Sequence, residues 1–478
     1  MAVIAEAAIE AEEADDEESG EIPLSPIQHW FFDANMPQPA HWNQSKLFDL
    51  PSTYDAQRLE AALQSTIAAH PLLSARFSKG ERGWVQALNS NDGESFQMET
   101  CSVSFSDSEA FHDTCLRWQS SLDLEQGPLW RIVVLQDTSG NNAHRLLFVV
   151  HHVVVDTVSW QILIDDIVHC YQNSSNSLPA EHCQFGKYVK HLENGTAETA
   201  ESPEKVDYWN DIAQSINRFR LPLPIQTIPI TEGAIQSITR TLDADSTELL
   251  RDEANVAFST TPQQLLLAAL ALALTDWTGH EAAIINLESH GREGFGLEQL
   301  DLSRSIGWMT AVFPAVLKVD SDIVATVKRI KDYHNQHSIR GIEYGALKRF
   351  LGSPDDRKLT SSVPEVLFNF LGVQSALTNS LLNPVPLKPQ SCRSENNYRQ
   401  HPIEINAVIQ DKKLSVEFST CQHLVSSDVG GKLADDFVNH LVDVITTCVE
   451  ADQAFTASDF AESGMSQADL DEFLSSID

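Results

Sequence analysis

The sequence predicts a mixed α/β (α+β) fold of two lobes, each a sheet covered by helices. The chain has 478 residues, which is too long for one small core. Strand-like and helix-like segments alternate through one stretch of about 200 residues and then alternate again through a second. We expect the lobes to span 22–200 and 201–455, between an acidic disordered linker at 1–21 and a C-terminal linker at 456–478.

The first half begins with a predicted helix at Ser25 and Pro26, because proline is favoured in the first turn of a helix. Leu59 and Leu63 share one face of a second helix, which Pro71 ends. The first-half elements are, in order, a helix from 26, a strand within 41–50, a helix at 55–69, two strands around a glycine turn within 74–88, a helix at 107–121 and a strand after the turn at 126–128.

The segment at 145–171 joins two periodicities. From Leu146 to Val150 the residues are continuously apolar, which is typical of a buried strand that ends at His151. Neighbouring strand residues point to opposite faces, so we expect only one of His151 and His152 to face a cavity and the other to pack. Helical spacing of apolar residues follows Asp156, which is placed to cap the helix near the histidines.

The second half begins after 173–204, a stretch rich in Ser, Asn, Glu and Gly that predicts a linker with one short helix around Phe185 to Leu192. Thr261 and Gln264 have capping-box spacing, and Gly279 can end the helix that they open. The elements that follow are, in order, a helix at 206–216, a strand at 236–243, helices at 245–254 and 262–277, strands at 282–288 and 306–317, a helix at 322–339, strands at 364–372 and 413–419, and a helix at 426–449.

Composition excludes several classes of protein. The net charge is −36 and no block of Lys or Arg stands out, so nucleic acid is not an expected partner. No apolar stretch reaches the roughly 20 residues that span a bilayer, so no membrane segment is expected. Seven cysteines without a C-x-x-C pair indicate reduced thiols in a cytoplasmic protein. The acidic N-terminus has no basic region and is not expected to be a signal peptide.

His152 is the leading candidate for acid–base chemistry, because the unperturbed pKa of histidine, about 6.5, lets it exchange protons near neutral pH. The alternative is a core histidine with satisfied hydrogen bonds. A metal site of His151, His152 and Asp156 is less favoured, because neighbouring strand residues diverge and no other His or Cys cluster has ligand spacing. Asp156 is expected to cap the helix or to pair with a buried arginine, for which Arg292 is the candidate.

Two further polar residues stand at strand positions. Glu288 ends a buried strand before a glycine-containing loop, where partial desolvation would favour a general base; the alternative is an exposed acid at the loop edge. Asn369 interrupts an apolar strand and must find hydrogen bonds, either to the backbone or to a substrate. The sequence has no G-x-S-x-G elbow and no phosphate-binding loop, which disfavours nucleophilic catalysis by serine and nucleotide-dependent chemistry.

Six stretches together resemble the condensation superfamily of nonribosomal peptide synthetases, and specifically its epimerization domains. They occur in the family's order: PIQHWF at 26–31, WNQS at 42–45, HHVVVDTVSW at 151–160, LESHGRE at 287–293, RSIGWMTAVFP at 304–314 and FNFLG at 368–372. The third stretch contains the HHxxxD motif of the superfamily, and Ser159 with Trp160 favours epimerization over condensation.

The resemblance implies two chloramphenicol-acetyltransferase-like lobes in a V-shaped pseudo-dimer with a central tunnel. It implies inversion, L to D, of the α-carbon of an aminoacyl or peptidyl thioester, without a bound cofactor. The thioester would arrive on the phosphopantetheine arm of an upstream carrier domain, and a condensation domain would lie downstream. By motif, His152 and Glu288 match the catalytic pair, while His151 supports the site and Asp156 is structural, bridged to Arg292.

Three positions depart from the family pattern. Ser289 replaces a common glycine, Glu343 lies in a stretch that is often rich in glycine, and Phe370 replaces a tyrosine. The sequence has no carrier motif of the G-G-x-S type, so we expect an excised or stand-alone domain. Two rival functions remain: an amide-forming condensation domain, which should lack Glu288 and FNFLG, and a catalytically silent module that only binds carriers.

Overall fold

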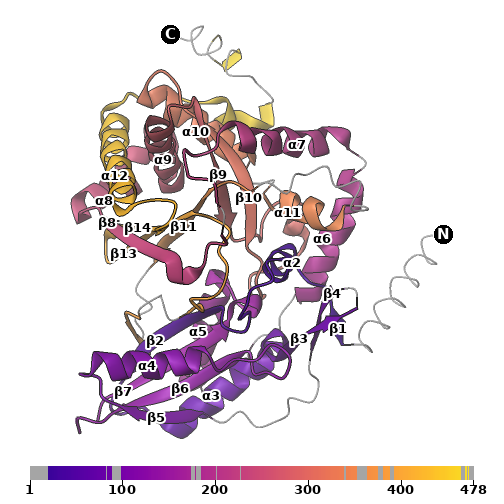
Figure 1. Cartoon of the computed structure of the whole chain (residues 1–478), viewed down its shortest axis with the longest axis vertical. Helices are drawn as coiled ribbons and strands as arrows, with labels where there is room; N and C mark the ends of the chain where they lie inside the picture. Colours follow the sequence, from indigo (N-terminus) through magenta and orange to yellow (C-terminus); the bar gives the residue numbers. More distant parts are fainter. Residues whose placement is uncertain are drawn as a thin grey trace, which may run out of the picture. The chain divides into compact units, whose positions relative to one another are not determined.

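A computed structural model shows two compact units (Figure 1). It describes residues 20–81, 83–88, 98–140, 142–173, 178, 185–200, 202–226, 228–337, 341–351, 363–374, 381–387, 392–463, 469, 470 and 472. Unit 1 comprises the described residues of 1–195, 296–310 and 377–398, and unit 2 comprises those of 196–295, 311–376 and 399–478. The two later segments of unit 1, 296–310 and 377–398, lie within the range 201–455 that the sequence predicted for the second lobe.

Unit 1 is built on a five-stranded sheet of order β12-β2-β7-β6-β5. Its strands are β2 (Asn43–Leu50), β5 (Glu99–Val103), β6 (Trp130–Asp137), β7 (His144–His151) and β12 (Asn383–Val385). β5 and β6 are parallel and the other pairs are antiparallel. A smaller sheet of order β1-β4-β3 contains β1 (Glu21–Ile22), β3 (Ala75–Gly80) and β4 (Gly83–Leu88). The helices are α2 (Pro26–Asp33), α3 (Ala56–Ala69), α4 (Ser108–Gln119) and α5 (Thr157–Gln172).

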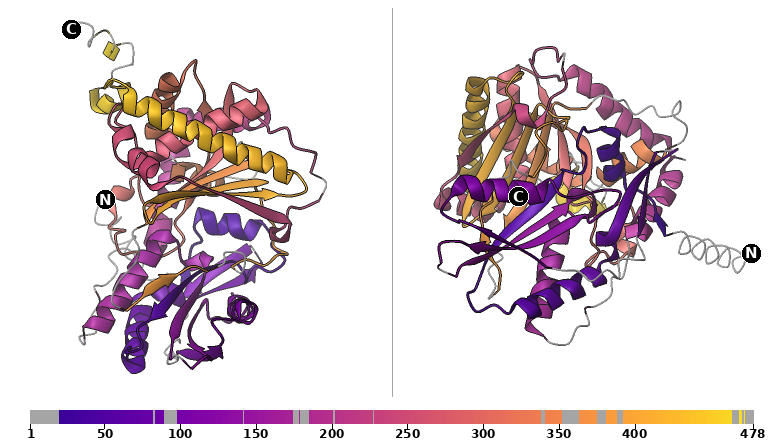
Figure 2. Two further views of the ribbon diagram at one scale, coloured as in Figure 1. Left: turned by 90° about the vertical axis from the view of Figure 1, so that its left-hand side faces the viewer. Right: turned by 60° about the horizontal axis from the view of Figure 1, so that its bottom comes forward.

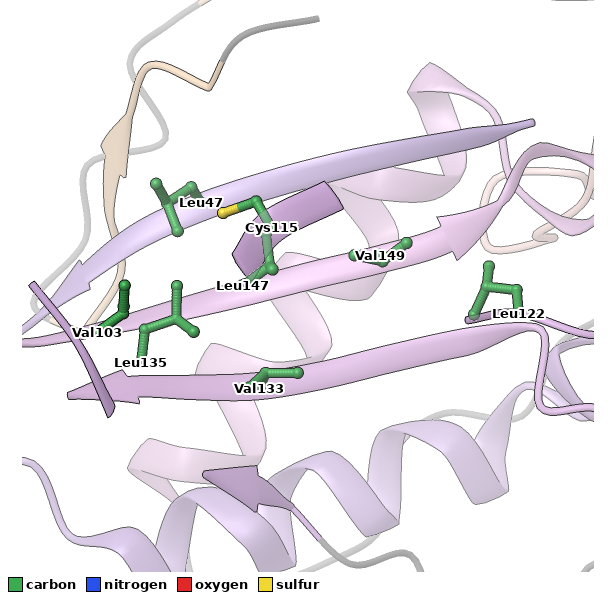
Figure 3. Packing of buried hydrophobic residues seen from close by; sticks show 8 residues of the cluster. All are labelled: Leu47, Val103, Cys115, Leu122, Val133, Leu135, Leu147 and Val149. Carbon is green, nitrogen blue, oxygen red and sulfur yellow. The ribbon is translucent and has the colours of Figure 1, made fainter. Parts of the chain in front are cut away.

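One face of the large sheet of unit 1 forms an apolar core under α4. Strand alternation turns Leu47 of β2 and both Leu147 and Val149 of β7 towards this face. Cys115 of α4 packs against them, as Figure 3 shows. Burying a side chain of this kind contributes about 1.5–3 kcal/mol, so the face stabilises the strand that leads to the histidine pair. The whole cluster is Leu47, Val103, Cys115, Leu122, Val133, Leu135, Leu147 and Val149.

Unit 2 is built on a six-stranded mixed sheet of order β10-β9-β11-β13-β14-β8. Its strands are β8 (Ile235–Thr241), β9 (Ala282–Ser289), β10 (Ala311–Lys318), β11 (Val366–Gln374), β13 (Ile403–Gln410) and β14 (Lys413–Cys421). β11 is parallel to both neighbours. The helices are α7 (Pro203–Arg218), α8 (Ala244–Arg251), α9 (Pro262–Thr278), α10 (Ile323–His337), α11 (Gly341–Phe350) and α12 (Ser427–Glu450), and α12 lies along one face of the sheet (Figure 2). α6 (Phe185–Ala200) crosses the boundary between the units in sequence.

The helices predicted from capping signals are confirmed. Ser25 and Gln28 form a capping box at α2, and Thr261 and Gln264 form another at α9. Gly279 ends α9 at a φ of 72°, a left-handed conformation that glycine adopts without strain. The mixed α/β fold class is confirmed as well.

Three element predictions were wrong or incomplete. α6 runs to Ala200 instead of ending near Leu192, because its polar residues occupy one side of an amphipathic helix and do not break it. The strand predicted from Ile306 begins only at Ala311, because the backbone before it bonds to side chains at the start of α5. Strands β1, β5, β12 and β13 and helix α11 were not predicted.

The start of the predicted C-terminal linker docks on α10. Lys331 of α10 is 1% exposed, and its Nζ lies 2.5 Å from an Asp459 carboxylate oxygen. Asn335 donates to the Ser458 hydroxyl over 3.1 Å, and Thr456 is fully buried. A buried ammonium needs such a partner, so this segment is part of unit 2. Residues 1–19 of the predicted N-terminal linker and most of 464–478 lie outside the described residues.

Within the described ranges, no helix has the length and apolar character needed to cross a membrane.

Candidate active site

His151 is the packing member of the histidine pair, of which strand alternation predicted that one would pack. It is the last residue of β7 and is fully buried. Its Nε2 lies 2.8 Å from the Pro39 carbonyl oxygen, and its Nδ1 accepts from the Val153 backbone N–H over 3.2 Å. The first contact needs an N–H on Nε2 and the second needs a lone pair on Nδ1, so the ring is neutral. Burial lowers the pKa of His151 to about 3, against the effect of its bond to Pro39.

His152 follows in a short 3-10 turn (His152–Val154) and is only partly buried. Its Nδ1 lies 2.8 Å from the Val155 carbonyl oxygen, and its Nε2 lies 2.9 Å from Nε2 of Gln44. Burial is the main cause that lowers the pKa of His152 to about 4; the charge of Arg393 adds to it, while Asp156 opposes it. A neutral ring with its proton on Nδ1 has its basic lone pair on Nε2.

Trp308 contributes a stacking surface for His152. The two rings stack with centroids 4.1 Å apart and planes 28° apart. Trp308 is 4% exposed and also meets Trp30 edge-on at 6.2 Å. Its carbonyl oxygen accepts from the Ser25 hydroxyl over 3.2 Å, which ties it to the start of α2. Trp308, which lies 156 positions later in the chain, therefore orients the His152 ring together with the bonds to Val155 and Gln44.

Asp156 caps α5, as predicted. One carboxylate oxygen accepts from the backbone N–H and the hydroxyl of Ser159, over 2.8 and 2.7 Å. The other accepts from the Met309 backbone N–H over 3.3 Å. The Ser159 hydroxyl also bonds to the backbone of Gly307. Asp156 and Ser159 thus stabilise both the helix start and the segment at 306–310 that contains Trp308.

Replacing Asp156 by Ala is expected to lower the free energy of unfolding by about 2–4 kcal/mol, because a helix cap is lost and buried N–H groups lose their acceptor. Asp156→Asn is the matched variant: it keeps an acceptor for Ser159 but turns an amide N–H towards Met309, so its loss should be smaller. Urea denaturation measures both. Equal stability of Asp156→Ala and the parent protein would contradict this role.

In unit 2, Glu288 and Asn369 share one face of the sheet. Asn286 of β9 pairs with Leu367 of β11, and each of the two parallel strands reaches Glu288 or Asn369 two residues later. The Asn369 amide donates to the Glu288 carboxylate over 2.6 Å. Asn369 therefore donates a hydrogen bond to the half-buried Glu288 side chain.

Two departures from the family pattern have structural explanations. Phe370 follows Asn369 and pairs with Ala407, so strand alternation places it on the face opposite Glu288. Glu343 is 5% exposed and accepts from the Trp209 indole over 2.9 Å, so it joins α11 to α7 within unit 2. The structure offers no account of Ser289.

Arg292 lies in the loop after β9, where its guanidinium donates to the His290 carbonyl oxygen over 3.1 Å. Its bridge to Asp156 stays a prediction. Across the described ranges, no three His, Cys, Asp or Glu side chains form a group able to hold a metal ion.

Sequence reasoning missed two residues at this site, Gln44 and Trp308. Both lie in stretches that resemble the family, WNQS and RSIGWMTAVFP. Trp160 was assigned from the motif, but its contacts were not foreseen: it is 4% exposed, meets Phe148 edge-on at 6.2 Å and donates to Gln44.

The comparisons with known proteins agree with the motifs. One of the subunits of linear gramicidin synthase from Brevibacillus parabrevis is 30% identical over 474 residues, which cover 96% of this chain and 9% of that protein. One of the subunits of mycosubtilin synthase from Bacillus subtilis is 32% identical over 482 residues, 96% of this chain and 18% of that protein. The chain thus spans less than a fifth of either relative.

Among solved structures, the epimerization domain from the third module of tyrocidine synthetase B superimposes with a TM-score of 0.82 at 27% identity, covering 90% of this chain and 98% of that one. A family model described as "Condensation domain" matches residues 18–463. The chain therefore belongs to the condensation-domain family of nonribosomal peptide synthetases.

Proposed function

We propose that this domain is an epimerase that inverts the α-carbon, L to D, of an aminoacyl or peptidyl thioester during nonribosomal peptide synthesis. The observation that supports it most directly is the likeness to the tyrocidine synthetase epimerization domain, which extends over 98% of that domain. Ser159 and Trp160, which favour epimerization by motif, are both buried around the HHxxxD turn.

The chemistry of the residues supports the same proposal. An α-proton beside a thioester is a weak acid, so inversion requires a base on one face, a proton donor on the other and stabilisation of the enolate between them. His152 offers a neutral ring with a basic Nε2. Glu288 offers a carboxyl group held by the Asn369 amide. We assign these two residues to the two faces of the α-carbon.

The proposed partners follow from the same chemistry. The substrate would arrive on the phosphopantetheine arm of an upstream carrier domain, and a downstream condensation domain would use the D-configured product. No cofactor of its own is proposed, because proton transfer needs none. The six cysteines in the described residues are free thiols, in keeping with a proposed cytoplasmic location.

Isotope exchange tests the proposal. Carrier domains loaded with a panel of L-aminoacyl and L-dipeptidyl thioesters are incubated with the domain in deuterated water, and the hydrolysed product is analysed for deuterium at the α-carbon and for chirality. We expect deuterium in the product and an approach to an L/D mixture for at least one member of the panel.

A second carrier loaded with an acceptor amino acid separates the rivals. Amide formation without α-deuterium would assign the domain to condensation. Carrier binding, measured by calorimetry, without exchange, inversion or amide formation across the panel would identify a silent module and refute the epimerase.

A further inference from the structure

A chain of hydrogen bonds joins Trp160, Gln44 and His152 within unit 1. The Trp160 indole Nε1 lies 2.7 Å from the side-chain oxygen of Gln44. An indole N–H can only donate, so the Gln44 oxygen must face Trp160 and its NH₂ group must face the other way. This contact therefore determines the orientation of the Gln44 side-chain amide.

The NH₂ group of Gln44 then meets the His152 ring. Its Nε2 lies 2.9 Å from Nε2 of His152, and an NH₂ group can only donate, so His152 must offer a lone pair there. The opposite ring nitrogen, Nδ1, lies 2.8 Å from the Val155 carbonyl oxygen, which can only accept. Both contacts require the neutral ring with its proton on Nδ1.

The surroundings hold this chain rigidly. Gln44 lies on β2 opposite Val150 of β7, one residue before the histidine pair. Trp160 lies in the first turn of α5, is 4% exposed and packs edge-on against Phe148. Strand and helix therefore meet at the Gln44 amide, which is bonded to Trp160 on one side and to His152 on the other.

We propose that Gln44 is a positioning residue that holds His152 in the neutral Nδ1–H form, and that Trp160 sets the direction of the Gln44 amide. A proton on Nε2 of His152 would point at the Gln44 N–H, so the imidazolium is disfavoured. His152 begins each cycle as a proton acceptor: the α-C–H bond breaks, Nε2 gains the proton and the electron pair enters the thioester enolate. The Gln44 amide has to turn away from Nε2 in that step. This catalytic consequence rests on the proposed function, but the state of the ring does not.

Other charges act on the same ring and enter the test. Arg393 disfavours the imidazolium, Asp156 favours it, and neutral His151 precedes it in the chain. None of these residues is changed in the variants below, so a shift in His152 reports on Gln44 and Trp160.

Nuclear magnetic resonance of the whole domain labelled with ¹⁵N in its histidine rings tests the proposal without substrate. The His152 signals are assigned by their loss in His152→Gln. We expect the parent protein to show the Nδ1–H form throughout pH 5.5–8. Gln44→Met removes the N–H donor and has a similar volume. It should raise the proton affinity of His152 at least tenfold, which is seen as a titration midpoint at higher pH. Gln44→Glu should keep His152 protonated at pH 7. Trp160→Phe, which lets the Gln44 oxygen turn towards Nε2 while the Val155 carbonyl still holds the proton on Nδ1, should also raise the titration midpoint of His152.

Gln161→Met is the matched control, because Gln161 is exposed on α5 next to Trp160 and should leave the His152 signals unchanged. An Nε2–H ring or an imidazolium in the parent protein at pH 7 would overturn the proposal, and so would unaltered titration in both Gln44 variants.

Activity provides a second readout. In Gln44→Met the acid limb of kcat for α-deuterium exchange should move to higher pH with little change in KM, which a merely structural role would not produce. If the ring states are as expected but no exchange occurs in the parent protein, the epimerase proposal fails while the positioning of His152 stands.

Discussion

Glu288→Gln and His152→Ala are each expected to lower the rate of inversion by about 10²–10⁴-fold, because each removes the proton carrier that we propose for one face of the α-carbon. The two variants should differ in the exchange of the α-proton that they still catalyse. Each keeps one carrier, which can still remove and return a proton on its own face. Deuterium should then enter one isomer without inversion.

The expected pattern is complementary. If Glu288→Gln exchanges the α-proton only of the L-loaded carrier, His152→Ala should exchange only that of the D-loaded carrier, or the reverse. Four incubations in deuterated water, two variants with two isomers, therefore assign each residue to a face. Exchange of the same isomer in both variants would contradict a division between two faces.

Matched substitutions at exposed sites control for this experiment. Glu253→Gln and His423→Ala change the same residue types at exposed positions in unit 2 and should keep full inversion. Circular dichroism establishes that the variants are folded. Full inversion by either His152→Ala or Glu288→Gln would refute the role given to that residue.

Local signals in the sequence predicted the helices and strands well. The capping boxes at Ser25 and Thr261 and the strand ending at His151 depend on residues within a few positions of one another. Short-range hydrogen bonds and side-chain alternation determine such features, and both can be read from spacing. Asp156 was recognised as a cap for the same reason.

Contacts between residues far apart in the chain could not be predicted from the sequence. β12 is only three residues long and pairs with β2, more than three hundred positions earlier. Trp308 reaches His152 because its segment bonds to Asp156 and Ser25. No spacing rule predicts which of many apolar or aromatic residues will meet a given strand end.

The position of Gln44 could not be predicted from the sequence for the same reason. The stretch WNQS was noted as a family resemblance, and its strand was predicted. Whether Gln44 or Ser45 faces α5 depends on the register between β2 and β7, because a shift by one residue exchanges the two faces. Register is fixed by packing across the sheet and cannot be derived from either strand alone.

Acidification is expected to destabilise both units well before the carboxylates titrate. His151 in unit 1 is fully buried and His401 in unit 2 is 1% exposed. Burial lowers the pKa of His151 to about 3 and that of His401 to about 4. In the unfolded chain both return to the ordinary value of about 6.5. Between these values the unfolded state binds a proton that the folded state does not, so stability falls as the pH falls.

The size of the loss follows from that proton count. Each histidine removes about 1.4 kcal/mol per pH unit below its unfolded pKa, or about 2–3 kcal/mol between pH 6.5 and 4.5. Urea denaturation at several pH values measures it. His401→Gln should reduce the slope of the free energy of unfolding of unit 2 against pH by the equivalent of about one proton. His423→Gln, at an exposed position, should leave that slope unchanged. A free energy of unfolding that is constant from pH 6.5 to 4.5 would mean that these rings are protonated in the folded protein, and His151 could then not accept from the Val153 N–H while it donates to Pro39.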